Sequence, residues 1–261
     1  MNNSQSLIEV RNLYKEYTDP GGQIKQVLDN LSFVIKTGEA FGLAGISGSG
    51  KSTVGRIIMN LEKASSGEIF FQGLSIFKKN LIDTKKIRAN MQMVFQNPLS
   101  SMNPRRTAQS IIEMPLKSFG IGNVKERKDR VYELLNLVGL NPRHAEYYPH
   151  QFSGGQCQRL GIARALASRP KFIFLDEPVS ALDVSIQAQI LNLLKELQEK
   201  FNLTYLIVAN NLNIEGFIAD RIAVIHDGKI VEMEKTEILF NNPQKFITKE
   251  LLKSILNVNL T

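Results

Sequence analysis

The 261-residue sequence contains one cysteine, Cys157, and no long apolar run. A single cysteine excludes an internal disulfide, a cysteine-ligated zinc site and a cysteine-bound iron–sulfur cluster within this chain. No apolar stretch reaches the roughly 18 residues that a membrane-spanning helix needs. The first residues, MNNSQSLIEV, lack the charged and then apolar layout of a secretory signal, so we expect a protein of the cytoplasm. We expect Cys157 itself to be a small buried residue on a helix.

The composition is that of an ordinary globular protein with an excess of positive charge. Apolar residues make up 43% of the chain, which is enough to bury a core. Lys and Arg number 32 against 25 Asp and Glu, a formal net charge of +7. Part of this excess lies in FKKNLIDTKKIR, residues 77–88. Such a run is most often a solvated face, although nucleic acid or anionic lipid would also be attracted to it.

The order of patterns along the chain is typical of an α/β protein. Residues up to about 75 alternate β-type runs with turns, which predicts a small antiparallel sheet. Residues 105–148 have helical periodicity, with apolar side chains of residues 131–138 on one face. From Phe152 onward, helices and apolar strands alternate as in a parallel sheet covered by helices. The last twenty residues predict a short terminal helix.

The motif GISGSGKST, residues 45–53, fits the pattern G-x-x-x-x-G-K-[ST] between an apolar strand and a helix. Its glycines let backbone N–H groups curve around an anion, Lys51 can reach the β- and γ-phosphates, and the Ser52 hydroxyl is a Mg²⁺ ligand. A glycine-rich turn without chemistry is the alternative, which the Lys-Ser-Thr run disfavours. We therefore predict that the chain binds a nucleoside triphosphate. The residues predicted to bind it are Gly45, Ser47, Gly48, Ser49, Gly50, Lys51, Ser52 and Thr53.

The segment KFIFLDEP, residues 171–178, has two carboxylates at the end of an apolar strand. In α/β sheets ligands bind at the carboxyl ends of strands. We expect Asp176 to hold Mg²⁺ through water and Glu177 to polarise the attacking water, because phosphoryl transfer needs a metal and a positioned nucleophile. An Asp-Glu pair at a strand end also occurs by chance, but the phosphate loop upstream makes chance a weak explanation.

The segment FSGGQCQRLGIARALASRPK, residues 152–171, predicts a second phosphate-binding site. Ser153, Gly154 and Gly155 begin a helix whose dipole favours an anion, and Gln156 follows them. With these motifs the sequence resembles the ATP-binding cassette (ABC) ATPases over nearly its whole length, and the family signature LSGGQ reads FSGGQ here. The resemblance implies an α/β fold with a P-loop NTPase (RecA-like) core, an antiparallel β subdomain and an inserted α-helical subdomain. It also implies head-to-tail pairing of two cassettes around ATP and Mg²⁺.

The resemblance further implies a division of one ABC ATPase domain that spans residues 1–261. Residues 1–96 and 171–240 would form the nucleotide-binding core with its β subdomain, residues 97–170 the helical insertion with the signature, and residues 241–261 a C-terminal tail. Tyr17 matches the aromatic residue that stacks on adenine, although by its residue type alone it is a strand residue. Gln96 matches the glutamine that touches Mg²⁺ and water, and Asp183 ends a loop that crosses the dimer interface.

Longer sequence segments narrow the resemblance to one group of importers. FQNPLSSMNPR, DEPVSALDVSIQAQILNLL and ADRIAVIHDGKIVE look like ATPase subunits of oligopeptide, dipeptide and nickel importers, and SGGQCQR looks like the second ATPase of a two-ATPase system. The implied partners are a second ABC ATPase, two membrane permeases and an extracytoplasmic solute-binding protein, with no nucleic acid. The implied location is peripheral, at the cytoplasmic face of the cell membrane. Peptides, nickel and metal chelates all remain open as solutes.

One position departs from the family pattern. Where the family has histidine and aspartate after a core strand, this sequence has Asn210 and Asn211. Asparagine is also a turn former and a helix N-cap, so a plain strand-to-helix corner is the alternative. An amide reaches less far than an imidazole and cannot carry positive charge, and His226 lies in a predicted hairpin turn and is no substitute.

We therefore predict that this chain's own site hydrolyses ATP poorly and that the chain works in a heterodimer. Three alternatives stay open. Asn210 could do the histidine's work adequately, the chain could be a non-hydrolysing regulatory subunit, or it could be a non-transport ABC ATPase that acts on DNA or ribosomes.

Overall fold

The computed structural model describes residues 5–77 and 81–258. They form two compact units, which lie within Met1–Lys79 plus Thr204–Thr261 and within Asn80–Leu203. We call these the first and the second unit and describe each by itself. The predicted subdomain boundaries at residues 96, 170 and 240 stay a prediction.

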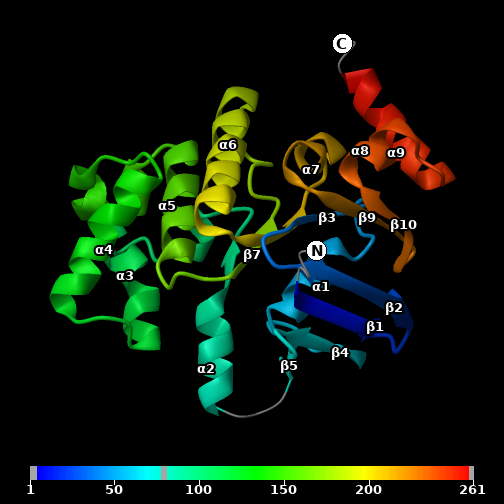
Figure 1. Ribbon diagram of the computed structural model, residues 1–261, viewed down its shortest axis with the longest axis horizontal. Coiled ribbons are helices and arrows are strands. Elements are labelled where there is room, and N and C mark those ends of the chain that lie inside the picture. Colours follow the sequence, from blue (N-terminus) through cyan, green and yellow to red (C-terminus); the bar gives the residue numbers. More distant parts are fainter. Residues whose placement is uncertain (1–4, 78–80, 259–261) are drawn as a thin grey trace. The chain divides into compact units, whose positions relative to one another are not determined.

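The first unit contains the antiparallel sheet that the sequence predicts. Its strands lie side by side in Figure 1 in the order β2-β1-β4-β5. The Asp19 side chain accepts hydrogen bonds from the backbone of Gly21 and Gln23, which closes the turn between the two long strands. The strands are β1 (Ser6–Thr18), β2 (Ile24–Lys36), β4 (Ser66–Phe71) and β5 (Leu74–Ser75).

The first unit also contains a group of buried parallel strands. Strand β3 (Ala40–Ala44) lies between β8 (Thr204–Val208) and β9 (Arg221–His226), and all residues of β3 and β8 are buried. Full burial on both faces explains why these segments are almost entirely apolar rather than alternating. Strand β10 (Lys229–Lys235) pairs antiparallel with β9 through a two-residue turn of Asp227 and Gly228, both at positive φ. The predicted hairpin next to His226 is thereby confirmed.

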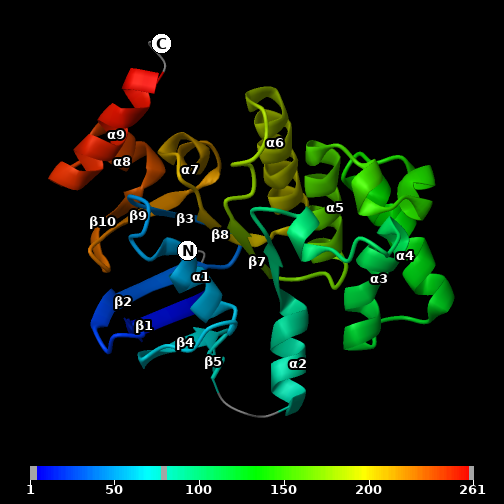
Figure 2. The ribbon, with the colours of Figure 1, turned by 180° about the vertical axis from the view of Figure 1, so that it is seen from behind.

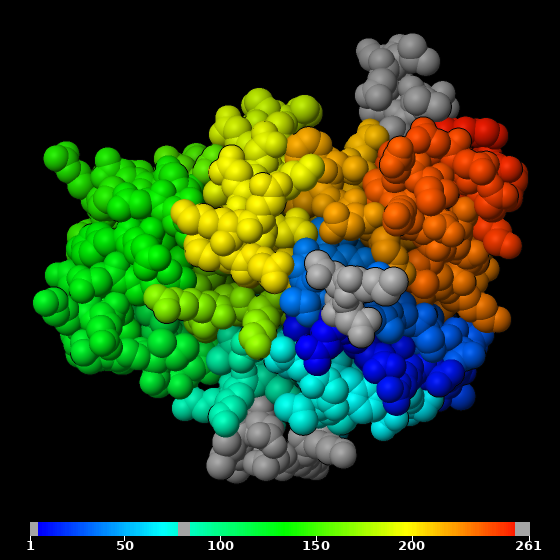
Figure 3. Space-filling model, viewed as in Figure 1, coloured from blue at the N-terminus to red at the C-terminus, as the bar shows by residue number. Residues whose placement is uncertain are grey.

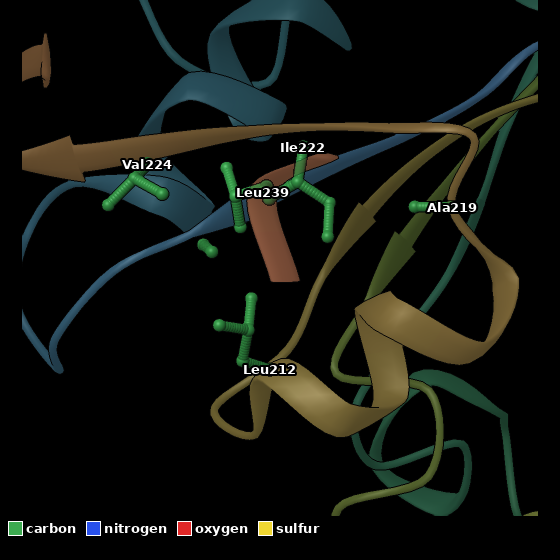
Figure 4. Close-up of a cluster of buried hydrophobic side chains, with 6 residues drawn as sticks. Leu212, Ala219, Ile222, Val224 and Leu239 are labelled. Atoms are coloured by element: carbon green, nitrogen blue, oxygen red, sulfur yellow. The ribbon is translucent and has the colours of Figure 1, made fainter. Parts of the chain in front are cut away.

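The described residues of the first unit include the helices α1 (Lys51–Ile58), α7 (Leu212–Ile218), α8 (Thr236–Asn241) and α9 (Phe246–Val258). Helix α9 confirms the predicted terminal helix. Helices α7 and α8 bury an apolar cluster with strands β3 and β9, in which Leu212, Ile222 and Leu239 meet (Figure 4). The atoms of β10, α8 and the start of α9 form one continuous surface, orange to red in Figure 3.

The second unit is mostly helical. Strand β6 (Met91–Val94) pairs in parallel with β7 (Phe172–Asp176). Helices α3, α4 and α5 lie side by side in Figures 1 and 2. Val131, Leu134, Leu135 and Val138 are buried, which confirms the predicted apolar face. The helices are α2 (Leu81–Asn90), α3 (Ala108–Phe119), α4 (Val124–Leu137), α5 (Gly154–Leu166) and α6 (Val184–Phe201).

The structure of the second unit shows where Cys157 and most of the basic run lie. Cys157 is fully buried on α5, as predicted. The basic run of residues 77–88 forms helix α2 over most of its length, which the sequence did not predict, and residues 78–80 lie outside the described part of the chain. No helix in the described ranges is both long and apolar enough to cross a membrane.

Candidate nucleotide-binding site

The phosphate-binding loop follows β3 and leads into helix α1. Gly45, Gly48 and Gly50 have φ angles of 152°, 79° and 99°, which side chains with a Cβ rarely adopt. A Cβ on Gly50 would lie 2.7 Å from Leu28 Cδ2, and a Cβ on Gly45 would overlap the carbonyl oxygen of Ile225. The glycines are therefore required both for the turn and for its close contact with neighbouring strands. Helix α1 begins at Lys51, so its first N–H groups are directed toward the loop.

Two polar side chains in this loop fit a phosphate group. Lys51 is buried, and its Nζ donates hydrogen bonds to the carbonyl oxygens of Gly45 at 2.7 Å and Ile46 at 2.9 Å. The Ser49 hydroxyl is buried and has no hydrogen-bond partner among the described residues. A buried hydroxyl without a partner costs free energy that an anionic oxygen would recover. Together with the start of α1, this donor set is suited to an anion.

Tyr17 lies near the end of β1, and the residue is 39% exposed. Its hydroxyl hydrogen-bonds to Glu62, and Lys15 Nζ lies 4.5 Å from the ring centroid. Burial and the Glu62 carboxylate raise the pKa of the Tyr17 phenol, while the Thr53 hydroxyl of the phosphate loop acts to lower it. The structure thus brings Tyr17 next to the phosphate loop, and the Lys15 contact is made on the ring itself.

In the second unit, Gln96 and Glu177 are joined directly. The Gln96 Nε2 atom donates a hydrogen bond of 2.7 Å to Glu177 Oε2 and lies 3.4 Å from the Ser180 hydroxyl. Glu177 follows β7 with a φ of 48°, an unfavourable conformation for a residue with a side chain. Strain at a polar residue after a core strand is typical of functional sites. The glutamine therefore holds a carboxylate that the backbone presents in a strained turn.

Asp176 is the last residue of β7 and is 7% exposed. No three His, Cys, Asp or Glu side chains cluster as a metal site in the described part of the chain. This absence does not conflict with the predicted Mg²⁺ ligands Ser52, Gln96 and Asp176, because Mg²⁺ is commonly held by one or two carboxylates together with phosphates of a substrate. A hydroxyl, an amide oxygen and a carboxylate are all oxygen donors, the type that Mg²⁺ prefers.

The signature segment begins helix α5 through a capping box. The Ser153 hydroxyl accepts the Gln156 backbone N–H at 3.3 Å, and Gln156 Oε1 accepts the Ser153 N–H at 3.0 Å. A Cβ on Gly155 would lie only 2.6 Å from Ile186 Cγ2, and a Cβ on Gly154 would lie 3.3 Å from Leu182 Cδ2. These glycines allow the signature to pack against the segment that starts α6. That packing role was not predicted, since the sequence cannot show which residue faces a glycine.

Other predicted residues are exposed. Ser153 and Gly154 are exposed at the start of α5. Asp183 is exposed at the N-cap of α6, and its side chain makes no capping hydrogen bond. Whether it crosses a dimer interface stays a prediction. Asn210 is exposed between β8 and α7.

Asn211 has a clear local role. Its side-chain oxygen accepts the backbone N–H of Asn213 at 2.9 Å and thereby caps helix α7. The strand-to-helix corner suggested by the two asparagines is therefore present. It accounts for Asn211, and the role of Asn210 stays a prediction.

Sequence reasoning missed one buried acid in this region. Glu215 on α7 has no exposed surface. The strand-helix pattern places residue 215 on a helix, but no local signal shows that this helix turns it inward.

The predicted residues thus gather in two groups. The first unit holds the phosphate loop, Tyr17 and Asn210, and the second holds Gln96, Asp176, Glu177 and the signature. Within the second group, Gln96 and Glu177 are in direct contact.

A family model described as "ABC transporter" matches residues 28–180. Three curated relatives match almost the whole chain. The oligopeptide transport ATP-binding protein OppF of Bacillus subtilis (strain 168) is 48% identical, with 97% of this chain and 83% of the relative covered. AppF of the same strain, also named for oligopeptide transport, is 45% identical over 97% of this chain and 79% of its own length. The dipeptide transport ATP-binding protein DppF of Lactococcus lactis subsp. cremoris (strain MG1363) is 45% identical over 98% of this chain and 83% of its own length.

Solved structures agree with this family match. A post-hydrolysis dimer of the ATP-binding cassette MJ0796, bound to ADP and Pi, has a TM-score of 0.78 and 36% identity, covering 88% of this chain and 98% of that chain. The protein cbiO1 of Clostridium perfringens, part of the complex cbiONQ, has a TM-score of 0.79 and 25% identity, covering 98% of this chain and 96% of that chain. The predicted fold class is confirmed: a P-loop NTPase core with an antiparallel β subdomain and an inserted helical subdomain.

Proposed function

The chain belongs to the ABC transporter family and is an ATPase of that family, and we propose that it powers the import of peptides. The observation that carries the proposal is identity of 45–48% over nearly the whole chain to ATP-binding proteins named for oligopeptide and dipeptide transport. These names favour peptides over nickel and metal chelates, which the sequence wording alone leaves open. A solute bound by the permeases and the solute-binding protein would not touch this chain.

Nucleotide recognition is assigned to the first group of residues. Lys51, Ser52 and Thr53, with the N–H groups of the glycine loop, would bind the phosphates of ATP, and Ser49 would give its buried hydroxyl to a phosphate oxygen. The exposed ring of Tyr17 offers a surface on which adenine can stack. Ser47 and the loop glycines leave the backbone open to the anion.

Hydrolysis is assigned to the second group. Glu177 would orient and deprotonate the attacking water, and Gln96 would hold that carboxylate through the 2.7 Å hydrogen bond. Mg²⁺ held by Ser52, Gln96 and Asp176 would neutralise negative charge on the phosphates. Because phosphoryl transfer depends mainly on positioning and electrostatics, loss of any one of these contacts should slow turnover more than it weakens nucleotide binding.

Pairing with a second cassette is supported by the exposed signature. Ser153 and Gly154 lie at the start of α5, where helix N–H groups favour an anion, and their own chain already has a phosphate loop. In the family the signature completes the nucleotide site of the paired cassette. The matching MJ0796 structure is described as dimeric. We propose that this chain pairs with a second, different ATPase and that Asp183 lies in the contact between them.

The difference between the two ATPases follows from Asn210. A neutral amide at this position can still hydrogen-bond, but it cannot carry the positive charge of an imidazolium. Loss of one positioning contact of this kind commonly costs about 10²- to 10³-fold in rate. We propose that the site built on this chain's phosphate loop binds ATP and turns over slowly, while the partner retains histidine and carries most of the hydrolysis.

The remaining assignments follow from the family. Two membrane permeases and an extracytoplasmic solute-binding protein would complete the importer. The chain would lie at the cytoplasmic face of the membrane as a peripheral subunit.

A regulatory subunit that binds ATP without hydrolysing it is the second candidate, and Asn210 is the observation that favours it. The two candidates differ in turnover at this chain's own site. Single-turnover hydrolysis by a complex whose partner carries a substitution of its catalytic glutamate would separate them, since only this chain's site could then act. Slow but measurable hydrolysis supports the first candidate. A rate no higher than that of the same complex with Glu177→Gln also introduced supports the second.

The transport role is tested by reconstitution in vesicles. We expect ATP-dependent uptake of labelled oligopeptides or dipeptides by the complex of this chain with its partner ATPase, permeases and solute-binding protein. Lys51→Ala should abolish the uptake that depends on this site. Lys63 is exposed and lies outside the motifs, so Lys63→Ala is the control and should leave uptake unchanged. Uptake of nickel but not of peptides would contradict the peptide assignment.

A further inference from the structure

Glu215 is a buried acid that the proposed mechanism does not use. It lies on the seven-residue helix α7, directly after the turn that carries Asn210 and Asn211. The helix is held firmly: Leu212 and Ala219 belong to the apolar cluster of Figure 4, and Gly216 packs against the ring of Phe240 so closely that a Cβ would overlap it. A carboxyl group inside such packing is costly, and an apolar side chain of similar size would be more stable there.

One oxygen of this carboxyl group has a defined partner. Glu215 Oε1 accepts the backbone N–H of Ala209 at 3.2 Å, and Oε2 is buried with no partner among the described residues. Ala209 comes directly after β8 and directly before Asn210. The hydrogen bond therefore joins the two ends of the turn that contains Asn210 and Asn211. It fixes Ala209, the residue that precedes Asn210 in the chain.

The base of the Glu215 side chain packs against the strand that leads to the phosphate loop. A Cβ on Gly42 of β3 would lie 3.4 Å from Glu215 Cβ, 3.0 Å from Ile222 Cγ1 and 3.2 Å from Ala219 Cβ. The phosphate loop begins at Gly45, three residues after Gly42. The carbonyl oxygen of Gly45 accepts a hydrogen bond from Lys51. Glu215 is thus placed between the turn of Asn210 and the strand that supports the phosphate loop.

The charged groups around Glu215 are few. Lys51 is the charged residue that acts on it electrostatically, and β3 carries no ionisable side chain. Helices α8 and α9, which also pack against α7, carry Glu237, Lys249, Glu250 and Lys253, all of them exposed. Burial raises the pKa of Glu215 to about 8, against the smaller opposing effects of the Ala209 N–H and Lys51. Near neutral pH the carboxyl group is therefore mostly protonated and uncharged.

We propose that Glu215 is a positioning residue for ATP hydrolysis, whose carboxyl group holds the backbone N–H of Ala209 and thereby sets the position of Asn210, the next residue in the chain. The inference rests on the proposed role of Asn210 in this chain's own site. Ionisation of Glu215 places a charge inside the protein that the Ala209 N–H and Lys51 offset only in part, so the turn opens more readily as the pH rises through about 8.

The test uses two substitutions of Glu215 and one control. Glu215→Gln keeps a neutral oxygen acceptor for Ala209, and Glu215→Leu keeps the volume and removes the acceptor. Glu237→Gln on the neighbouring α8 changes an exposed acid and serves as the control. Steady-state hydrolysis at this chain's site is measured from pH 6 to 9 in a complex whose partner site is inactivated, which gives kcat and the Km for ATP. Amide hydrogen exchange is measured on a peptide that contains Ala209.

We expect Glu215→Leu to lower kcat by up to about 100-fold with little change in Km, because a misplaced group near a reacting centre can cost that much. Glu215→Gln should keep kcat within about 2-fold of the wild type at pH 7, because it keeps a neutral oxygen acceptor for the Ala209 N–H. It should also remove the decline in kcat that we expect for the wild type above pH 8. Exchange at Ala209 should be protected in the wild type and Glu215→Gln and lost in Glu215→Leu.

Wild-type kcat and unchanged protection in Glu215→Leu would overturn the inference and leave Glu215 with no role in positioning. If this site proves unable to hydrolyse ATP, the proposed enzymatic role fails, and the exchange at Ala209 still decides whether Glu215 holds the turn. Protection that is lost equally in Glu215→Gln would also overturn the inference, because the acceptor oxygen would then be irrelevant.

Discussion

Gln96 and Glu177 are joined by a 2.7 Å hydrogen bond between Nε2 and Oε2, although they are 81 positions apart in the sequence. The bond holds a carboxylate that follows β7 with a strained backbone. If Glu177 is the catalytic carboxylate that we propose, a glutamine bound to it offers a direct way for movement of one segment to change the geometry of hydrolysis. The proposed chemistry of this chain is concentrated in that pair.

Replacing Glu177 should therefore abolish hydrolysis at this chain's site without preventing ATP binding. We expect Glu177→Gln to lower single-turnover hydrolysis at this site by about 10²- to 10⁴-fold, because the amide cannot accept the proton of the attacking water. In steady-state ATPase assays of the assembled complex the loss should be smaller than the loss caused by the same change in the partner, since in the proposed pair the partner would carry most of the turnover. Equal losses of ATPase activity from the two substitutions would argue against two sites with unequal turnover.

Replacing Asn210 by histidine should strengthen this site. We expect Asn210→His to raise its single-turnover rate by up to about 10²-fold, because an imidazole can carry positive charge near the γ-phosphate. Asn213→His, on an exposed asparagine of the same turn and helix, is the matched control and should change little. If both substitutions leave the rate unchanged, Asn210 already does the work and the site is not weakened at this position.

Gly155 should be needed for packing as well as for phosphate binding. Gly155→Ala would bring a Cβ within 2.6 Å of Ile186 Cγ2, and we expect it to lower the free energy of unfolding by about 1 to 3 kcal/mol. The double variant Gly155→Ala, Ile186→Ala should recover part of that loss in urea unfolding experiments. Gly154→Ala, with 3.3 Å to Leu182 Cδ2, should cost less.

The contribution of the signature to the partner is measured on the same variants. If the N–H groups at Gly155 also bind the partner's nucleotide, the double variant regains stability but not the ATPase activity of the complex. Full recovery of both would reduce the role of Gly155 to packing.

Glu215 should make the stability of the protein depend on pH. Its pKa is 4.5 as a free side chain and about 8 in the folded chain, so the folded state binds the proton more tightly. The stabilisation from this proton is fully present below pH 4.5 and is lost as the pH rises through about 8, by at most about 5 kcal/mol. Relative to Glu215→Gln, which does not titrate, the wild type should therefore be less stable at pH 9 than at pH 5 in urea unfolding. A constant difference between the two proteins would contradict this.

How much could be predicted from the sequence depends on how local each feature is. The phosphate loop, the Asp176–Glu177 pair and the signature are short motifs whose residue types are required by backbone geometry and charge, so they could be found without coordinates. The contact of Gly155 with Ile186 and the burial of Glu215 depend on which helix packs against which strand. The sequence does not indicate helix α2, because the charges of this segment obscure any apolar periodicity.

The central claim is that this chain works on ATP only together with a second cassette. The most direct test is the steady-state ATPase rate of the purified chain alone, compared with the rate of the chain assembled with its partner ATPase and permeases. The account predicts that turnover per ATPase subunit rises strongly on assembly and that Ser153→Ala lowers the assembled rate through the partner's site. Full turnover by the isolated monomer, unaffected by Ser153→Ala, would contradict it.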